Sequence, residues 1–150
     1  MDQQLLEPFQ EFLNEPVTRA DYEQLLCALI DEFQAERGCF WLEQDNAFLY
    51  MGDEQLRKEF PFSRQAVDAV LIEGRSFLSF DPQKDPRIEK GSSLAVNLRT
   101  CLAASCVDSQ DQVLVVAYFD NDLNSEPFSH KQLRLLKAVL SMVPGAVPVE

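Results

Sequence analysis

The segment at residues 81–87 holds the densest grouping of side chains that could take part in chemistry. It reads Asp-Pro-Gln-Lys-Asp-Pro-Arg, so two carboxylates, a lysine and an arginine lie within seven residues. Aspartate followed by proline is typical of turns, which favours a solvated loop. Loops carried by a rigid scaffold also commonly hold ligand-binding side chains, which favours the polar rim of a ligand site. The residues of this segment leave both interpretations open.

Other groupings of catalytic or metal-binding side chains are hard to find. The one histidine, His130, lies just inside a predicted helix, where we expect a solvated surface residue. No motif around serine or cysteine indicates a nucleophile held against a base. Neither common glycine-rich phosphate-binding motif occurs, so no cofactor is predicted. The residues therefore favour a protein that is not an enzyme.

The four cysteines are expected to be buried, reduced thiols rather than ligands. Their spacing does not match that of metal sites, so no metal is predicted. Cys101 and Cys106 lie an odd number of residues apart on a predicted strand, so their side chains point to opposite faces. The four are Cys27, Cys39, Cys101 and Cys106.

Composition and charge exclude several classes of protein. The chain has 150 residues, 46% of them hydrophobic, which suffices for one folded domain. Its net charge is −12, and the first 60 residues contain 14 acidic against 4 basic side chains. Such a surface repels phosphate backbones, so no nucleic-acid partner is expected. No apolar run approaches the roughly 18 residues of a membrane span, and no signal peptide is recognisable, so we expect a cytoplasmic protein.

Two helices are expected before the first strand. Helical spacing of apolar residues predicts the first within residues 1–16, with Pro8 tolerated in its first turn. Thr18 and Asp21 form a capping box that begins the second, and Gly38 is expected to end it or to form the turn that follows. Its buried stripe comprises Tyr22, Leu25, Leu26, Leu29, Ile30 and Phe33.

The remaining elements predict a largely antiparallel sheet with helices on its faces. Two hairpins are expected, and a strand at residues 76–80 lies between them. A helix begins at Ser63, and another begins at Ser129, buries Leu133, Leu136, Leu140 and Val143, and ends at Pro144. This order predicts an α+β fold. The hairpin strands are residues 39–42, 47–51, 100–107 and 113–119.

Several runs of sequence occur in the order found in GAF domains, so the chain resembles that family over about residues 18–143. It is most similar to GAF modules of bacterial enhancer-binding transcription activators and to those beside forkhead-associated domains. The runs are residues 35–42 (AERGCFWL), 62–74, 77–87 (FLSFDPQKDPR), 98–102 (LRTCL) and 118–121 (YFDN) with 128–129.

The resemblance implies a fold, a division of the chain and a role. The fold is a PAS-like antiparallel sheet of about six strands, with N- and C-terminal helices on one face and a loop-covered pocket on the other. The implied division is a helical extension at 1–16, the GAF domain at 17–143 and a frayed tail at 144–150. The role is regulatory and non-catalytic: binding a small molecule, or acting as a dimerisation or interaction module with a signalling protein. The alternative is a thiol-dependent reductase of the free methionine sulfoxide type, which would need an accessible cysteine of low pKa.

Candidate ligand-binding residues follow from the implied pocket. Alternation places three residues of one strand on a common face, and two residues of the first strand lie beside them. The segment at 81–87 supplies the rim. Val115 stands where relatives carry glycine, so its side chain either fills the cavity or faces the helices. The candidates are Phe40, Leu42, Thr100, Leu102 and Ala104 for the floor and Asp85 and Arg87 for the rim.

The apolar stripe of the first helix has no assigned place in the family fold. Exposed, it would be an aggregation liability, so it must either fold back onto the other helices or pair with a second copy. We expect the second alternative, a homodimer. The candidate dimerisation residues are Leu5, Leu6, Phe9, Phe12 and Leu13.

Overall fold

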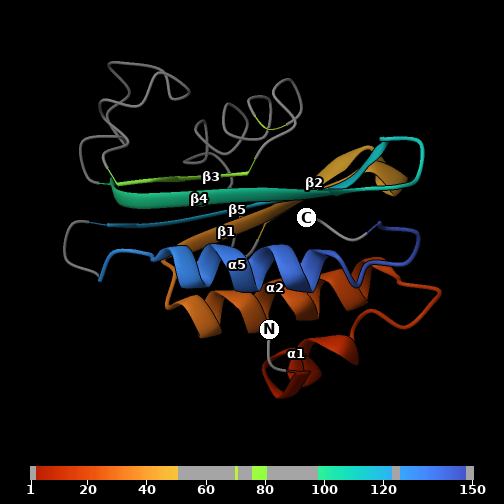
Figure 1. Cartoon of the computed structure of the whole chain (residues 1–150), viewed down its shortest axis with the longest axis horizontal. Helices are drawn as coiled ribbons and strands as arrows, with labels where there is room; N and C mark the ends of the chain where they lie inside the picture. The colour runs from red at the N-terminus through yellow and green to blue at the C-terminus, as the bar shows by residue number, and fades with distance from the viewer. Residues whose placement is uncertain (1–2, 51–69, 71–75, 81–97, 123–125, 148–150) are drawn as a thin grey trace.

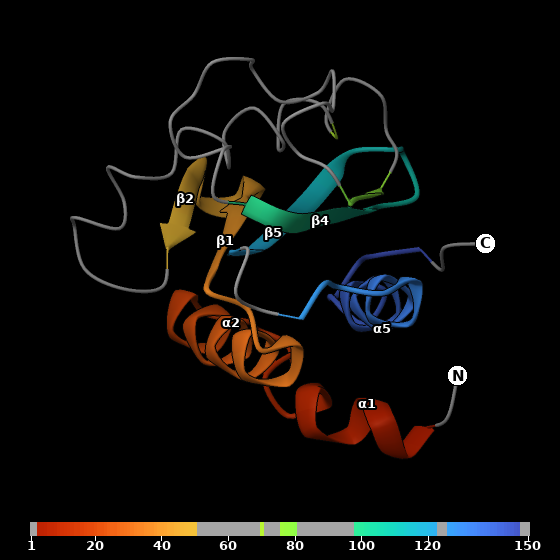
Figure 2. The same cartoon turned by 90° about the vertical axis from the view of Figure 1, so that its left-hand side faces the viewer.

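The computed structural model describes residues 3–50, 70, 76–80, 98–122 and 126–147 (Figure 1). Its centre is a five-stranded antiparallel sheet in the order β2-β1-β5-β4-β3. Two helices cover one face of this sheet, and a third lies on their outer side (Figure 2). The predicted α+β fold with an antiparallel sheet is confirmed, with five described strands where about six were expected.

Two hairpins build most of the sheet, as predicted. In the first, β1 (Arg37–Leu42) and β2 (Ala47–Tyr50) flank the short 3-10 turn η1 (Glu43–Asp45). The second joins β4 (Leu98–Val107) to β5 (Val113–Asp122). The register of the two long strands pairs them over nearly their whole length, so they form the rigid middle of the sheet.

The second hairpin turn is held by a side chain. The Asp108 carboxylate accepts hydrogen bonds from the backbone N–H groups of Gln110 and Gln112, at 2.8 and 3.0 Å. This is the local bonding that makes aspartate a favoured turn residue. The short edge strand β3 (Phe77–Ser79) pairs with β4. The predicted loop at 81–93 and nearly all of the helix predicted from Ser63 lie outside the described residues.

Helix α2 (Arg19–Phe33) begins as the sequence predicts but ends earlier. Thr18 and Asp21 form the capping box, and the Thr18 backbone N–H and hydroxyl hold the pKa of Asp21 below its usual value. The helix ends at Gln34, whose backbone is left-handed with φ of 53°. The expectation that Gly38 ends the helix or forms the turn after it is wrong, because Gly38 lies within β1.

Gly38 is needed for close packing rather than for a turn. A Cβ at this position would lie 2.8 Å from the Phe119 ring and 2.9 Å from Ile30 of α2. Real Cβ contacts are essentially never that short, so the missing side chain is what lets α2 approach the sheet.

Helix α5 (His130–Leu140) has the predicted capping box of Ser129 and Gln132. Its buried face is broader than predicted: Leu133 is only partly buried, whereas four other side chains are covered. The helix contacts the sheet on one side and α1 on another, so side chains on more than one side of the helix are buried. After it, the Val147 N–H donates to the Val107 carbonyl at 2.9 Å, which ties the start of the predicted tail to β4. The covered side chains are Leu135, Leu136, Val139 and Leu140.

The stripe of α1 (Gln3–Gln10) folds back onto the chain's own helices (Figure 2). Phe9 and Leu13 are 4% and 6% exposed within the main core. Leu6 and Phe12 pack partly buried against that core, and only Leu5 of the five is exposed, at 45%. Of the two alternatives for this stripe, the structure therefore shows the first, in which the segment packs against the chain's own helices. The homodimer stays a prediction, without the exposed stripe on which it depended.

The position of Pro8 also differs from expectation. It is the sixth residue of α1 instead of lying in the first turn. Pro8 is exposed, so its ring contacts solvent. Because proline has no backbone N–H, this helix of two turns loses only one backbone hydrogen bond. Among the described residues, no helix is both long and apolar enough to cross a membrane.

Candidate functional site

The two faces of the sheet carry different sets of side chains. Along β5, Val115, Ala117 and Phe119 belong to the large core shared with the helices. The residues between them, Val116 and Tyr118, belong to a second, smaller cluster on the opposite face. We call this opposite face the ligand face, because the family resemblance expects the pocket there. It also includes Cys39, Val70, Cys101 and Ala103, all buried.

The strand register brings the ligand-face residues into rows across the sheet. One row runs from Tyr50 through Cys39 and Tyr118 to Ala103. Directly paired residues on neighbouring strands project to the same side, so these side chains are neighbours. The adjacent row is polar and joins Arg37, Asp120, Cys101 and Ser79. A third row joins Phe48, Trp41, Val116 and Ser105.

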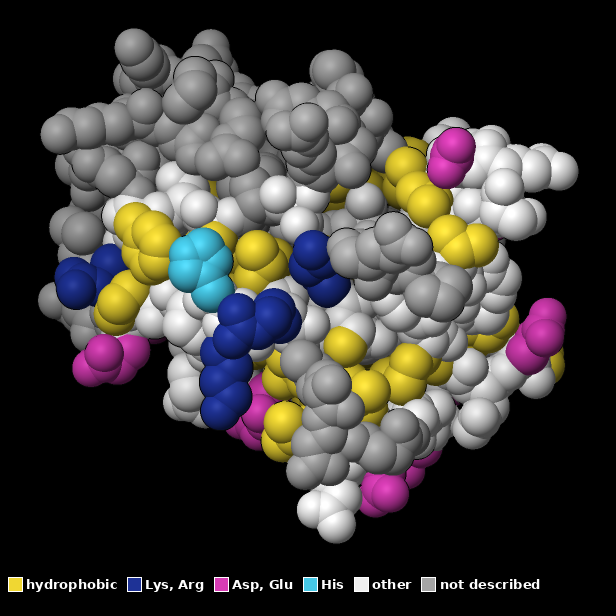
Figure 3. All heavy atoms as spheres, viewed as in Figure 1, with side chains coloured by type: hydrophobic (Ala, Val, Ile, Leu, Met, Phe, Trp, Pro, Cys, Tyr) yellow, Lys and Arg dark blue, Asp and Glu magenta, His cyan; other side chains and the backbone are white. Residues whose placement is uncertain are grey.

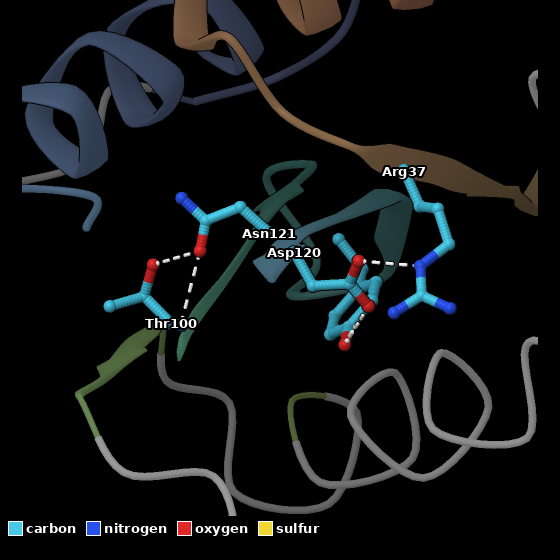
Figure 4. A network of polar contacts seen from close by, with 5 residues as sticks. Arg37, Thr100, Asp120 and Asn121 are labelled. Carbon is cyan, nitrogen blue, oxygen red and sulfur yellow. Dashed lines mark hydrogen bonds and ion pairs between the residues drawn. The ribbon is translucent and has the colours of Figure 1, made fainter. Parts of the chain in front are cut away.

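The polar row contains a buried ion pair braced by a phenol (Figure 4). The Arg37 Nε donates to Asp120 Oδ1 at 2.8 Å, and the Tyr118 hydroxyl donates to Oδ2 at 2.7 Å. The Asp120 side chain is 1% exposed and that of Arg37 is 13% exposed. Each carboxylate oxygen thus has a donor, which is the condition for keeping a charge away from water.

Burial dominates the protonation of this cluster. It raises the pKa of Tyr118 well above the usual value, and the neighbouring Asp120 charge adds to the shift, so the phenol keeps its proton and donates. Burial also raises the pKa of Asp120, while the Arg37 charge and the Tyr118 hydrogen bond oppose that shift. The cluster therefore presents a fixed, oriented set of polar groups at one end of the ligand face.

The row at the β1–β2 edge is aromatic. The Trp41 and Phe48 rings meet edge to face with centroids 5.1 Å apart, and Phe48 stacks on Tyr50 at 5.6 Å. The Trp41 Nε1 atom is buried and has no hydrogen-bond partner among the residues that the structure describes. Buried hydrogen-bond donors without an acceptor are rare in proteins, and a functional role is one explanation for them.

A second polar network lies on the helix-facing side of the same strand ends (Figure 4). Asn121 Oδ1 accepts from the Thr100 hydroxyl at 2.6 Å and from the Thr100 N–H at 3.1 Å. The Asn121 amide donates to the Glu126 carbonyl, and the Phe128 N–H donates to the Thr100 hydroxyl at 3.0 Å. These bonds join β4 and β5 to the segment that begins α5. Asp120 and Asn121, adjacent in the chain, thus serve opposite faces of the sheet.

The structure corrects the floor predicted for the pocket. Phe40, Leu42, Leu102 and Ala104 are fully buried in the core against the helices, and Thr100 bonds within the network just described. The prediction that residues 100, 102 and 104 share a face is sound, but the face is the helix-covered one. Val115 likewise faces the helices and fills no space on the ligand face. The predicted rim residues, Asp85 and Arg87, lie outside the described residues.

The residues that the ligand face does present were not among the candidates predicted from the sequence. Arg37, Tyr118 and Asp120 lie inside the runs that carry the resemblance, so a signal was available. Two residues of opposite charge also lie at the ends of two apolar strands that pair, one on each strand. This arrangement indicates an ion pair between the strands. No sequence signal would have found the unpartnered Trp41 nitrogen, because it depends on what surrounds the ring.

The cysteines and the histidine lie outside any catalytic grouping among the described residues. Cys101 and Cys106 are buried on opposite faces, as predicted, and burial raises the pKa of Cys106 to about 12. This gives the thiol reductase alternative no support. Cys27 is exposed on α2, contrary to expectation. His130 is exposed as predicted. The described part of the chain holds no group of three or more His, Cys, Asp or Glu arranged to hold a metal ion.

Comparison with known protein families decides what this architecture is. A model of the GAF domain matches residues 21–147. The chain belongs to the GAF domain family. GAF domains are regulatory and sensory domains, and the match includes every described strand together with α5 and nearly all of α2. No curated protein matches the chain.

Solved GAF domains share the fold. A domain from a GAF/HD protein of Geobacter sulfurreducens superimposes with a TM-score of 0.59 at 16% identity, over 80% of this chain and 85% of that one. The GAF domain of A. aeolicus nlh2, in an inactive state, gives 0.60 at 9% identity over 93% and 90%. That of an Acinetobacter phosphoenolpyruvate-protein phosphotransferase gives 0.63 at 15% over 95% and 91%. At such identities the likeness concerns the fold alone.

Proposed function

We propose that this chain is a non-catalytic GAF domain of bacterial signalling that senses a small molecule on its ligand face. Membership of a regulatory and sensory family supports the role. The motif resemblance to GAF modules of enhancer-binding activators supports the same setting, in the cytoplasm. The place of binding is supported by the polar and aromatic rows on the sheet face away from α2 and α5.

One observation carries the proposal: the buried Trp41 Nε1 has no acceptor within the described part of the chain. A buried donor left without a partner costs about 1–3 kcal/mol relative to one that is hydrogen-bonded. A bound molecule with an acceptor beside the indole would remove that cost. Binding would then be favoured by an interaction that the free protein lacks.

The surroundings of the indole indicate the chemistry of the ligand. Phe48 and Tyr50 present ring surfaces next to it, which suits a flat or apolar part of a small molecule. The ligand class is therefore a compact molecule with a hydrogen-bond acceptor beside a flat, largely apolar portion.

The test uses the fact that Trp41 is the only tryptophan in the chain. Nucleotides and metabolites are first screened for a rise in melting temperature, because a molecule that binds only the folded state must stabilise it. Each stabilising compound is then titrated while the emission of Trp41 is recorded. A ligand on the ligand face shifts that emission, whereas one bound elsewhere leaves it unchanged.

A matched control removes the donor and keeps the ring shape. Growth of a tryptophan auxotroph on benzothienylalanine replaces Trp41 with a ring of nearly equal size that has no N–H. We expect this protein to be at least as stable as the native one without ligand, because the buried donor is removed, and to bind the ligand about tenfold more weakly, as loss of one buried hydrogen bond implies. Equal affinity of the two proteins, or a screen without any stabilising compound, would contradict the proposal and favour the interaction-module alternative.

A further inference from the structure

Helix α5 differs in charge from the rest of the chain. Its eleven residues contain Lys131, Arg134 and Lys137 and no acidic side chain, in a protein of net charge −12. By contrast, the exposed side of α2 carries the acidic side chains Glu23, Asp31 and Glu32. The helix layer is thus divided into an acidic and a basic part.

The basic side chains of α5 gather on its solvent side. His130, Arg134 and Lys137 are spaced by four and three residues and share one side of the helix, and Lys131 lies three residues before Arg134. Figure 3 shows these charges together over α5, with hydrophobic side chains next to them. His130, Lys131 and Arg134 are exposed, and Lys137 is partly exposed.

None of the three cations on α5 is neutralised by an ion pair with another described residue. Of the three described arginines on other elements, Arg19 pairs with Glu23 and Asp45 and Arg37 pairs with Asp120, whereas Arg99 of β4, like the α5 cations, has no ion pair with another described residue. Unpaired cations in an acidic protein attract carboxylates from outside the chain.

An exposed aromatic ring extends this charged surface. Phe80 is 56% exposed, and among the described residues Leu5 is the only other exposed large hydrophobic side chain. The Phe80 ring meets His130 with centroids 5.9 Å apart. Exposed aromatic residues beside cations are typical anchors of protein interfaces. We call the surface formed by Phe80, His130, Lys131, Arg134 and Lys137 the α5 patch.

We propose that the α5 patch docks an acidic segment of a partner protein, one that carries carboxylates around at least one apolar side chain. The cations would pair with the carboxylates, and Phe80 would bury against the apolar side chain. The patch belongs to the helix layer, so this docking does not depend on a ligand bound to the opposite sheet face.

The charge of the whole chain decides between classes of partner. A long polyanion or an anionic membrane would extend beyond the patch and meet the acidic remainder of the surface. A short acidic segment contacts the patch alone, because at physiological salt exposed charges further than about 8 Å away are largely screened. Each exposed ion pair contributes little, so the complex should be weak and sensitive to salt.

The experiment measures binding of a labelled peptide to the whole chain. The probe is a fluorescein-labelled peptide of about 14 glutamate and leucine residues, with leucine at helical spacing. A control peptide has glutamine in place of every glutamate. Anisotropy is recorded at low and at high salt, and the same protein is mixed with phosphatidylglycerol vesicles and with duplex DNA.

Two triple variants with equal change in charge are compared. The first neutralises the patch (K131Q, R134Q and K137Q), and the second adds three acids in the exposed turn between β4 and β5 (S109E, Q110E and Q112E). We expect the first to weaken peptide binding about tenfold, as loss of three exposed ion pairs implies, and the second to have little effect. F80S should weaken binding several-fold while leaving its salt dependence unchanged, because it removes apolar contact only.

Four binding results would overturn the proposal, and so would one result from light scattering. They are equal weakening by the two triple variants, equal binding of the glutamine peptide, no binding of the acidic peptide at low salt, and tighter binding of vesicles or DNA than of peptide with the same dependence on the patch. A change of oligomeric mass caused by the first triple variant, measured by light scattering without peptide, would assign the patch to a second copy of the chain and would equally overturn it.

Discussion

At the scale of single residues, burial sets what the thiol groups of this GAF domain can do. A cysteine reacts as the thiolate, which exists in water but is disfavoured where no solvent reaches it. Cys39, Cys101 and Cys106 have no more than 1% of their surface exposed, whereas Cys27 lies on the solvent side of α2. Reactivity is therefore expected only at Cys27, which, like the other cysteines, lies outside any catalytic grouping among the described residues.

We predict that Ellman's reagent at pH 8 labels one thiol per native chain rapidly and four after denaturation. C27S should abolish the rapid reaction, whereas C106A, the matched control at a buried position, should leave it unchanged. The pKa of Cys106 rises from 9.0 to about 12 on folding, so its contribution to stability is complete below pH 9 and is lost as the pH rises toward 12. Labelling at pH 8 thus samples the intact fold. Two rapid equivalents at that pH would show that a buried cysteine is accessible.

At the scale of elements, the helix layer can approach the sheet because of one missing side chain. Gly38 of β1 lies beneath Ile30 of α2 and beside Phe119 of β5, at distances that leave no room for a Cβ. Interiors are packed as densely as organic crystals, so added volume must be accommodated by displacement of a neighbour. The position thus joins three elements.

We predict that Gly38→Ala lowers the free energy of unfolding by about 1–3 kcal/mol, the usual range for overpacking in a core. The double variant with Ile30→Ala should be more stable than the sum of the two single changes implies, because the shorter side chain relieves part of the clash. Urea unfolding of the four proteins completes this cycle. Strict additivity, or a Gly38→Ala protein as stable as the native one, would contradict the packing role.

The same elements show how far the sequence alone could go. Capping residues and turn residues act locally, so Thr18, Ser129 and Asp108 predicted the starts of α2 and α5 and the β4–β5 turn correctly. Alternation also showed that Thr100, Leu102 and Ala104 share a face. It could not show which face that is, because both faces of the sheet carry buried apolar clusters. The alternation of apolar and polar residues that normally identifies the solvent-facing side of a strand is then absent. The candidate site was consequently placed on the helix-covered side.

At the scale of the whole molecule, the chain covers its apolar surface with its own segments. α1 closes the outer side of the helix layer, and Phe9 and Leu13 reach the core shared with α2 and α5. The acidic side chains Glu23, Asp31 and Glu32 of α2 remain on the outside, while the basic side chains of α5 form the patch of opposite sign. Apolar burial therefore holds the layers together, and charge distinguishes their exposed surfaces.

If α1 completes the core of a single chain, its substitutions should act on stability and not on assembly. We predict that Phe9→Ala and Leu13→Ala each lower the free energy of unfolding by about 2–5 kcal/mol, the range for truncation of buried side chains. Leu5→Ala, the matched change at the exposed position, should alter it by less than about 0.5 kcal/mol. The melting temperature should not change over a hundredfold range of protein concentration, because a fold that depended on a second copy would be stabilised by mass action. A melting temperature that rises with concentration in the native protein, and not in Phe9→Ala, would instead show that the α1 stripe pairs between chains.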